Sequence, residues 1–526
     1  MEYSPAYTES CDENGKVMFT FSRTYTNSQV MDNLADITDD EDFYKDNTTK
    51  SVDYFYKFYR QMQERVETGN IILIELVFRL TELFADKIKQ TQRILESNKI
   101  TFDMLQDVLK IGEKFVTLMD GHLVGSVVHH TEYITGGMGE RYFMIQGKLT
   151  TTNGKKYTQV TKEFYIPFFR GTCNPQDLSV RLMTEEDNKT LTQRGQKFVK
   201  YALNTHYLKY NGKMFINTQY GIQEFDANGR IMVDKVGYDT IYKSSQGYMY
   251  NTNNTNDNIL VPEELMFMTY PFLSGFSFKA KRWGQIYIDL IEEIVFDENA
   301  FDYLVLDSDL KMMIKSMILN YNNCFKDIIT GKSGGCIFLL HGPPGTGKTL
   351  TCESVSELMK HPLYSITSGE LGTNVDMLEK KLVQILEIAE KWNAVVLIDE
   401  ADVFMEKRTT EDIQRNAMVG VFLRLLERYD GVMFLTTNRE NTIDEAFKSR
   451  ISVSLKYDYL TKEQKIAIWK NLLNASGMIY NTENIERICN YDFNGRQIKN
   501  IIRNMQSITG TNEFNLEIFN KILSFM

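Results

Sequence analysis

The pattern of hydrophobic residues changes once in the first half of the chain, from a helical period to strand-like runs. Apolar residues recur at three- and four-residue steps over 51–119, for example in IELVFRLTELFADKI, and this period predicts a helical segment. Over 120–280 the pattern changes to β-rich runs such as HLVGSVVHHTEYI and KKYTQVTKEFYIPFF, which Gly-rich or Asn-Gly turns separate. We therefore predict a small antiparallel β-rich domain there, interrupted by one helix over Glu185–Tyr201.

Three further stretches lack such a period. Residues 1–50 are polar and acidic, which predicts a disordered acidic tail. Gln246–Asn258 is rich in Asn and Thr, a composition typical of an exposed loop. Residues 281–335 are predicted to form a linker, with a helix near Lys311–Asn323 that leads into the last part of the chain.

Short, continuous apolar runs mark the last part of the chain. Cys336–Leu340 and Val395–Ile398 are entirely apolar, and Val432–Thr436 is nearly so. Such runs are typical of strands buried on both faces of a parallel sheet. A helical stretch, Leu350–Lys360, follows the first run, so we predict alternating strands and helices over 336–458.

Composition narrows the class of protein. With 526 residues, the chain is too long for one compact core, and 43% hydrophobic and 25% charged residues are typical of soluble globular domains. A net charge of −11 disfavours broad binding to phosphate backbones, so nucleic acid is not expected as the main partner. Ile71–Phe84, the most apolar stretch, is charged and too short to span a bilayer, and MEYSPAYTES is no secretory signal. We therefore expect no membrane association.

The cysteines give no metal-binding pattern. The six residues, Cys11, Cys173, Cys324, Cys336, Cys352 and Cys489, include no pair at CxxC spacing, which argues against a zinc site. Free cysteines of this kind suit a reducing compartment, so we expect a cytoplasmic or otherwise intracellular location.

A glycine-rich stretch, GPPGTGKT, stands between the first apolar run and its helix. Strand, glycine-rich turn and helix in this order form a phosphate-binding loop, because glycines let backbone N–H groups converge on a phosphate at the positive end of the helix. Lys348 is expected to reach the β- and γ-phosphates, and the Thr349 hydroxyl to bind Mg²⁺. The predicted ATP-binding residues are Gly342, Pro343, Pro344, Gly345, Thr346, Gly347, Lys348, Thr349 and Leu350.

Polar residues follow the other two apolar runs. Asp399 ends the second run and is expected to hold the Mg²⁺ shell, and Glu400 is expected to polarise the attacking water as general base. Asn438 follows the third run, where its side chain can hydrogen-bond the attacking water or the γ-phosphate. Two arginines complete the set of catalytic candidates: Arg450 in DEAFKSRI and Arg496 in FNGRQIKN.

The motifs GPPGTGKT, LIDEAD, TTN, SRI and GRQIKN, in this order, resemble those of the AAA family of ATPases. The resemblance implies a multidomain α+β chain in which a C-terminal doubly wound α/β core and a small helical lid, residues 459–526, follow the β-rich domain and the helical segment. It implies a homo-oligomeric ring, by analogy a hexamer, with ATP between subunits. Arg450 would then reach the neighbour's γ-phosphate as an arginine finger, and Arg496 would act as the lid sensor.

The likeness extends more weakly into the N-terminal half. FFRGT, RGQKFV and GRIMVD are similar to a group of fungal and viral sequences that carry a β-rich domain before a single AAA core. The first pore loop departs from threading members of the family, because GELGTNVDMLEK (369–380) has no aromatic residue. Leu371 and Val375 are the apolar contacts expected of it. This departure argues against threading of a polypeptide through a central pore.

Three functions fit these observations. The leading one is an ATPase that remodels protein complexes, with a protein substrate or adaptor bound through residues 51–280. The first alternative is a nucleic-acid remodelling motor, either clamp-loader or helicase-like, which the acidic balance disfavours. The second is a nucleotide-gated assembly scaffold. Glu400 argues against the scaffold, because a protein that only binds nucleotide gains nothing from a general base.

Overall fold

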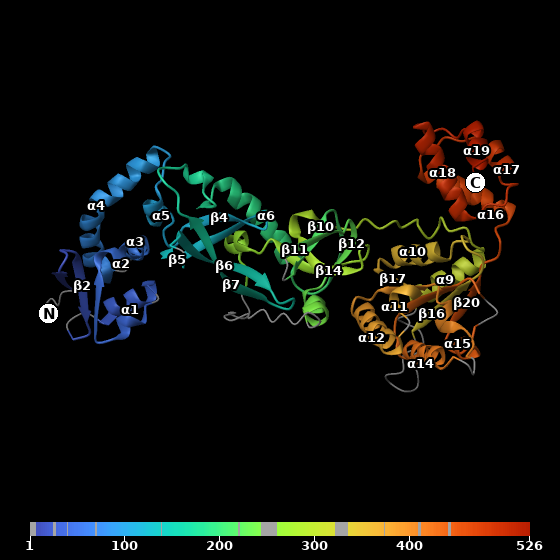
Figure 1. Cartoon of the computed structure of the whole chain (residues 1–526), viewed down its shortest axis with the longest axis horizontal. Helices are drawn as coiled ribbons and strands as arrows, with labels where there is room; N and C mark the ends of the chain where they lie inside the picture. Colours follow the sequence, from blue (N-terminus) through green and yellow to red (C-terminus); the bar gives the residue numbers. More distant parts are fainter. Residues whose placement is uncertain are drawn as a thin grey trace.

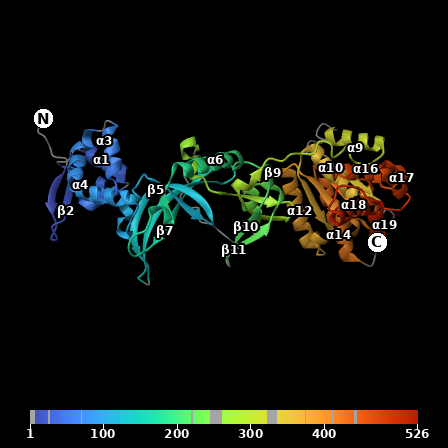
Figure 2. The same cartoon turned by 90° about the horizontal axis from the view of Figure 1, so that it is seen from above.

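The computed structural model describes residues 7–24, 28–38, 40–68, 71–137, 139–218, 221–243, 260–320, 335–372, 374–408, 412–439 and 443–525. The predicted Asn/Thr-rich loop Gln246–Asn258 lies outside these residues. Successive units follow one another along the long axis of the molecule, with the helical lid beside the parallel sheet near the C-terminal end (Figures 1 and 2). Antiparallel sheets precede a parallel one, so the predicted multidomain α+β class is confirmed.

The prediction of a disordered tail over residues 1–50 is wrong for the described part of that segment. It contains β1 (Thr8–Cys11), β2 (Val17–Ser22), α1 (Ser28–Thr38) and β3 (Asn47–Ser51), and the strands form an antiparallel sheet. Phe19 of β2 is fully buried and meets the ring of Phe55 at 5.8 Å. A carboxylate of the acidic stretch forms an ion pair within the segment, since Asp42 pairs with Lys50 at 2.7 Å. Composition alone misled here because these contacts join separate parts of the segment.

The predicted helical segment 51–119 is helical only as far as Val108. Its helices are α2 (Val52–Tyr56), α3 (Tyr59–Glu67), α4 (Ile74–Glu96) and α5 (Leu105–Val108). In α4, Leu76, Leu80 and Phe84 recur every four residues and are buried on one face, as an amphipathic helix requires. Among the described residues, no helix is both long enough and apolar enough to cross a membrane.

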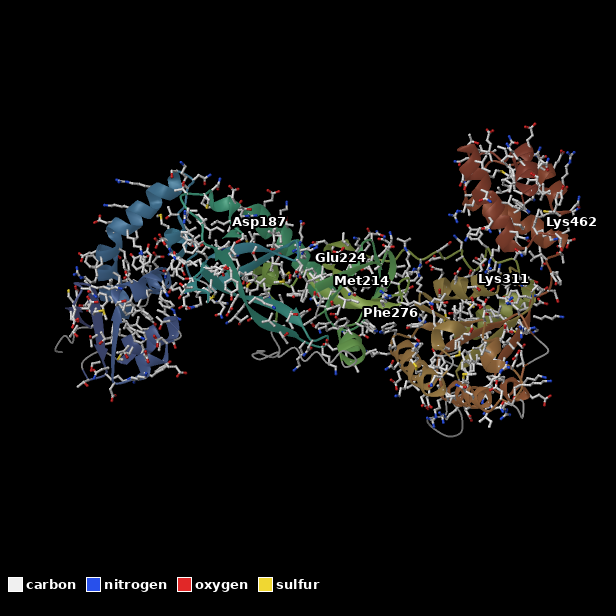
Figure 3. All side chains as sticks on the ribbon, viewed as in Figure 1. Asp187, Met214, Glu224, Phe276, Lys311 and Lys462 are labelled. Carbon is white, nitrogen blue, oxygen red and sulfur yellow. The ribbon has the colours of Figure 1, made fainter. Side chains whose placement is uncertain are left out.

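An antiparallel sheet with strand order β7-β6-β5-β4-β8 comes next. Its strands are β4 (Lys114–Met119), β5 (His122–Thr135), β6 (Arg141–Thr152), β7 (Tyr157–Pro167) and β8 (Val180–Leu182). The helix predicted over Glu185–Tyr201 is confirmed as α6. A capping box begins it, in which Thr184 and Asp187 each accept the other's backbone N–H (Asp187 is labelled in Figure 3).

A second antiparallel sheet has seven strands in the order β11-β10-β14-β13-β12-β9-β15. They are β9 (His206–Tyr210), β10 (Lys213–Thr218), β11 (Gly221–Asp226), β12 (Gly229–Val233), β13 (Phe272–Ser277), β14 (Arg282–Tyr287) and β15 (Ile291–Glu292), with α7 (Lys235–Gly237) after β12. The single β domain predicted over 120–280 is therefore two sheets. The linker is expected from residue 281 but begins after Glu292. Residues 282–287 form β14 because they pair with β13, and their own short sequence does not predict a strand.

The C-terminal core is a parallel sheet in the order β17-β18-β19-β16-β20. Its strands are β16 (Cys336–His341), β17 (Leu363–Thr367), β18 (Val395–Asp399), β19 (Val432–Thr437) and β20 (Val453–Lys456). The helices of this unit are α9 (Ser308–Asn320), α10 (Lys348–Met359), α11 (Ser368–Leu371), α12 (Val375–Lys391), α13 (Asp402–Met405), α14 (Ile413–Arg428) and α15 (Glu445–Lys448). Because parallel strands share one carboxyl edge, the polar residues after β16, β18 and β19 meet there.

A small helical lid ends the chain. It consists of α16 (Lys462–Ala475), α17 (Thr482–Ile488), α18 (Gly495–Thr509) and α19 (Leu516–Leu523). Trp469, Ile498 and Phe519 lie in a hydrophobic cluster of the lid's own, separate from the clusters of the parallel sheet. The lid is thus packed as a unit by itself.

The seven-stranded sheet and the core share one hydrophobic cluster. Phe276 of β13, labelled in Figure 3, stacks on Tyr364 of β17 with ring centroids 5.4 Å apart. Trp283 of β14 meets Trp392, after α12, at 5.7 Å. A cluster that draws side chains from both units makes them one packed body.

Candidate functional site

The glycine-rich loop joins β16 to α10, and two of its glycines show why a side chain cannot replace them. Gly342 has φ +142°, and a Cβ there would lie 2.0 Å from the backbone oxygen of Tyr457. Gly347 has φ +105° and is the N-cap of α10. These positive φ values turn the chain from the loop into the helix, and the first N–H groups of a helix have no acceptor within it, which makes such a helix start suited to binding an anion.

Lys348 is buried against its own loop. Its Nζ donates to the backbone oxygens of Gly342 at 2.7 Å and Pro343 at 2.8 Å, and to Oδ1 of Asn438 at 2.9 Å. Burial lowers the pKa of Lys348 below its usual value, and the carboxylate of Asp399 opposes this shift. Two residues that the sequence analysis placed in one site, Lys348 and Asn438, are therefore in direct contact.

Asp399, the last residue of β18, and Glu400, which follows it, are held by a residue of the neighbouring strand. The hydroxyl of Thr436, near the end of β19, donates to Oδ1 of Asp399, and its oxygen accepts the backbone N–H of Glu400 at 3.1 Å. Glu400 has φ +56°, a left-handed conformation that is uncommon for a residue with a side chain. Such strain persists where neighbouring contacts fix it, as Thr436 does here.

A cavity of about 860 Å³ opens over these residues. It is lined by the loop from Pro344 to Thr349, together with Leu350, Asp399, Glu400, Asn438 and Arg496, so the structure brings these predicted residues together. Gly342 and Pro343 are not in its lining and instead supply the carbonyls that hold Lys348. The volume is within the range of small-molecule sites.

The wall opposite the loop is apolar and was not predicted from the sequence. It combines part of the linker after β15 with one face of α16: Leu304, Val305, Leu306, Ile468, Leu472 and Ala475. Asn471 of α16 donates to the backbone oxygen of Tyr303 at 2.9 Å, which joins the two parts of this wall. No motif marks these residues, and the triplet Leu304–Leu306 does not stand out in the linker, which has a second apolar triplet at Ile294–Phe296.

The lid also touches the glycine-rich loop directly. The backbone N–H of Gly495, the first residue of α18, donates to the backbone oxygen of Gly345 at 2.9 Å. A Cβ on Gly345 would lie 2.6 Å from Cγ of Asn494, the N-cap of α18. The close approach of these backbones brings Arg496, one residue further, to the cavity.

Arg450 lies outside this cavity. Its Nη1 donates to the backbone oxygen of Ala446 at 2.9 Å, and its Nη2 pairs with Glu427 of α14 at 3.1 Å. The described chain therefore does not bring Arg450 to its own phosphate-binding loop.

The first pore-loop stretch, 369–380, differs from expectation in its apolar contacts. Leu371 is fully buried, whereas Val375 is only partly buried and packs against the same hydrophobic cluster. Met377, on the first turn of α12, is instead 56% exposed. The expectation is wrong for Leu371, which is part of the buried core, and for Val375 it stays a prediction.

Two parts of the chain match known families. Residues 338–459 match the ATPase family associated with various cellular activities (AAA), and residues 90–187 match a domain of unknown function (DUF7025). The ATPase family AAA domain-containing protein FIGL1 of Arabidopsis thaliana is 28% identical over 190 residues, which cover 34% of this chain and 28% of the relative.

Other relatives match a similar length of the chain. The ATP-dependent zinc metalloprotease FtsH of Ureaplasma parvum is 31% identical over 177 residues, covering 31% of this chain and 24% of the relative. The pachytene checkpoint protein 2 homolog of Xenopus tropicalis is 27% identical over 206 residues, covering 33% and 46%. The chain thus spans less than half the length of each of these relatives.

Proposed function

We propose that this chain, whose C-terminal region is an AAA ATPase domain with further domains before it, binds and hydrolyses ATP. The observation that carries the proposal is that Lys348, Asp399, Glu400 and Asn438 line one cavity of nucleotide size. They come from the ends of two strands, β18 and β19, and from the start of α10, which are far apart in the sequence. A glycine-rich loop with only a structural role would have no reason to face this set.

The donor set suits a magnesium triphosphate. The Thr349 hydroxyl and the Asp399 carboxylate are hard oxygen ligands of the kind Mg²⁺ prefers, and a bound Mg²⁺ would neutralise charge on the phosphates. Lys348 would exchange its contacts with the loop carbonyls for phosphate oxygens. Glu400 would accept the proton of the attacking water while Asn438 orients that water. The apolar wall would pack against the adenine base of the nucleotide.

Arg450 and Arg496 would act from different sides. Arg496 lies beside the glycine-rich loop, where a cation would draw the lid toward bound phosphates. Arg450, which pairs with Glu427 and lies outside the cavity of its own chain, would serve the site of a neighbouring copy in a homo-oligomeric ring, by analogy a hexamer. A monomer that hydrolysed ATP at the full rate under high dilution would contradict this role for Arg450.

We propose further that ATP turnover drives the remodelling of protein complexes. The units before the core, within residues 51–280, would carry the surface for a substrate or adaptor. One relative is named a putative 26S proteasome regulatory subunit homolog, and another an ATP-dependent protease, which supports a protein as the partner. The first pore-loop stretch has a single exposed methionine, Met377, in place of an aromatic step.

The central test is steady-state ATP turnover of the wild type beside Glu400→Gln. We expect Glu400→Gln to bind ATP with unchanged affinity and to lose at least about 100-fold in kcat, because a general base contributes 10²–10⁴-fold. Glu390→Gln, an exposed glutamate late in α12, is the matched control and is expected to keep wild-type turnover. Equal turnover of wild type and Glu400→Gln, or a wild type that releases no phosphate, would refute the proposal.

A further inference from the structure

The linker that enters the core also builds part of the nucleotide cavity. After β15 ends at Glu292, residues 293–307 pass along α10 before α9 begins at Ser308 (Figure 1). This segment supplies Asp297, Ala300 and the triplet Leu304–Leu306 to the lining. Its position therefore decides whether the apolar wall stands opposite the glycine-rich loop.

Arg230, on β12 of the seven-stranded sheet, holds this segment through α10. Its Nη2 pairs with Oε1 of Glu357 at 2.5 Å, and the other oxygen of Glu357 accepts the backbone N–H of Asp297 at 3.1 Å. One carboxylate thus connects β12, α10 and the linker. Glu353, which lines the cavity, lies one turn earlier on the same face of α10.

Aromatic rings fix the guanidinium in place. Arg230 lies over the ring of Phe296, in the linker, at 5.2 Å and over that of Tyr207, on β9, at 5.6 Å. Its Nη1 also donates to the Tyr207 hydroxyl at 3.1 Å. A planar guanidinium that stacks and forms ion pairs at once is pre-organised, so little rotamer entropy opposes these contacts.

The environment of the Arg230–Glu357 pair sets it apart from the ion pairs around it. Its side chains are 29% and 18% exposed. Lys209, the cross-strand neighbour of Arg230 on β9, pairs with Glu292 at 2.9 Å, but these side chains are 48% and 52% exposed. Solvent screens an exposed pair, so the Lys209 pair contributes little, whereas the shielded Arg230 pair holds its geometry.

We infer that Arg230 is a positioning residue for the nucleotide base: through Glu357 and Phe296 it holds the linker so that Leu304–Leu306 face the base of the bound nucleotide. The inference rests on the proposed ATP site and adds to it a requirement for the seven-stranded sheet. It follows that affinity for the base depends on Arg230, whereas affinity for the phosphates depends on the glycine-rich loop, the Mg²⁺ ligands and Arg496.

The test compares two ligands on the full-length chain by titration calorimetry with Mg²⁺ present. ADP has a base, and inorganic tripolyphosphate does not. For Arg230→Ala we expect ADP to bind about tenfold more weakly, as when the competent linker position falls to about a tenth of the population, with tripolyphosphate unchanged within about twofold. In turnover, KM for ATP is expected to rise by a similar factor with kcat little changed.

Three further variants guard against general misfolding. Arg230→Lys keeps the charge but not the planar stacking, and is expected to fall between wild type and Arg230→Ala. Glu357→Gln removes the ion pair with Arg230 but keeps an acceptor for the backbone N–H of Asp297. Combining it with Arg230→Ala is expected to weaken ADP binding no further than Arg230→Ala alone, because the ion pair is already lost. Lys209→Ala is the matched control and is expected to bind both ligands as the wild type does.

Each outcome decides one question. A selective loss of ADP affinity in Arg230→Ala supports the inference. Unchanged ADP affinity, or equal weakening of ADP and tripolyphosphate, overturns it while leaving the proposed ATPase intact. A wild-type chain that binds neither ligand refutes the proposed function itself.

Discussion

Thr436 is the residue through which the geometry of the two carboxylates can be tested. It is almost fully buried, donates its hydroxyl hydrogen to Asp399 and accepts the backbone N–H of Glu400. Thr436→Val keeps the shape of the side chain and removes both hydrogen bonds. Glu400 is then free to leave its left-handed conformation, and the carboxylate that is proposed to activate water loses its fixed direction.

The magnitude follows from the two bonds. A neutral hydrogen bond contributes about 1 kcal/mol and one to a carboxylate about 1.5–3 kcal/mol. If about 2 kcal/mol of this orientation is needed in the transition state, kcat falls about 30-fold, since each 1.36 kcal/mol is a factor of ten. The phosphate-binding loop is untouched, so ADP affinity is expected to stay within about twofold.

The next residue provides the control. Thr437 is equally buried, but its hydroxyl donates to Asp402, and its oxygen accepts the backbone N–H of Arg439 at 2.9 Å. Thr437→Val is expected to lower the urea unfolding midpoint by about as much as Thr436→Val does, but to keep kcat within about threefold of wild type. Steady-state phosphate release and urea unfolding of both variants are the assays. Equal loss of kcat in the two variants, or none in Thr436→Val, would refute this account.

Two further predictions concern stability. Asp234 is buried and accepts hydrogen bonds from Lys391 Nζ at 2.8 Å and Trp392 Nε1 at 2.9 Å. Asp234→Ala is expected to lower the free energy of unfolding of the joined sheet and core by about 3 kcal/mol, measured by urea unfolding with tryptophan fluorescence. A change below about 0.5 kcal/mol would contradict this. Burial raises the pKa of Glu353, so the native state binds a proton that the unfolded chain has lost, and stability falls as the pH rises above the ordinary glutamate value. Glu353→Gln is expected to weaken this fall, and identical pH dependence of unfolding in both proteins would exclude the effect.

The chemistry of the site was predictable because it depends on short local patterns. Asp399 and Asn438 stand at or just after the ends of apolar runs, and Lys348 ends the glycine-rich loop that follows another; in a parallel sheet such positions share one edge whatever the intervening sequence. The contact between Lys348 and Asn438 is the physical result. Their individual roles remain predictions, which the turnover experiments test.

What the sequence did not reveal depends on long-range packing. Leu304–Leu306 become part of a cavity wall only because α16 of the lid joins them there, and Thr436 matters only because β18 is its neighbour. The strand state of Arg282–Tyr287 comes from its pairing with β13. The prediction of a disordered N-terminal tail is wrong for a similar reason, since Phe19 and Phe21 stand in a largely polar stretch of sequence, and Phe55 packs on both only in the fold.

The positions of these contacts determine where nucleotide-driven motion is expected. The seven-stranded sheet is tied to the core near both ends of α12. Before α12, Lys281 pairs with Glu370 of α11 at 2.6 Å, and at its end Asp234 pairs with Lys391. A shared aromatic cluster fills the space between, and packed cores move as rigid bodies. The lid, in contrast, has its own cluster and meets the glycine-rich loop through the backbone hydrogen bond from Gly495. We therefore expect ATP turnover to rotate the lid against a body made of core and sheet, so that the sheet follows the core.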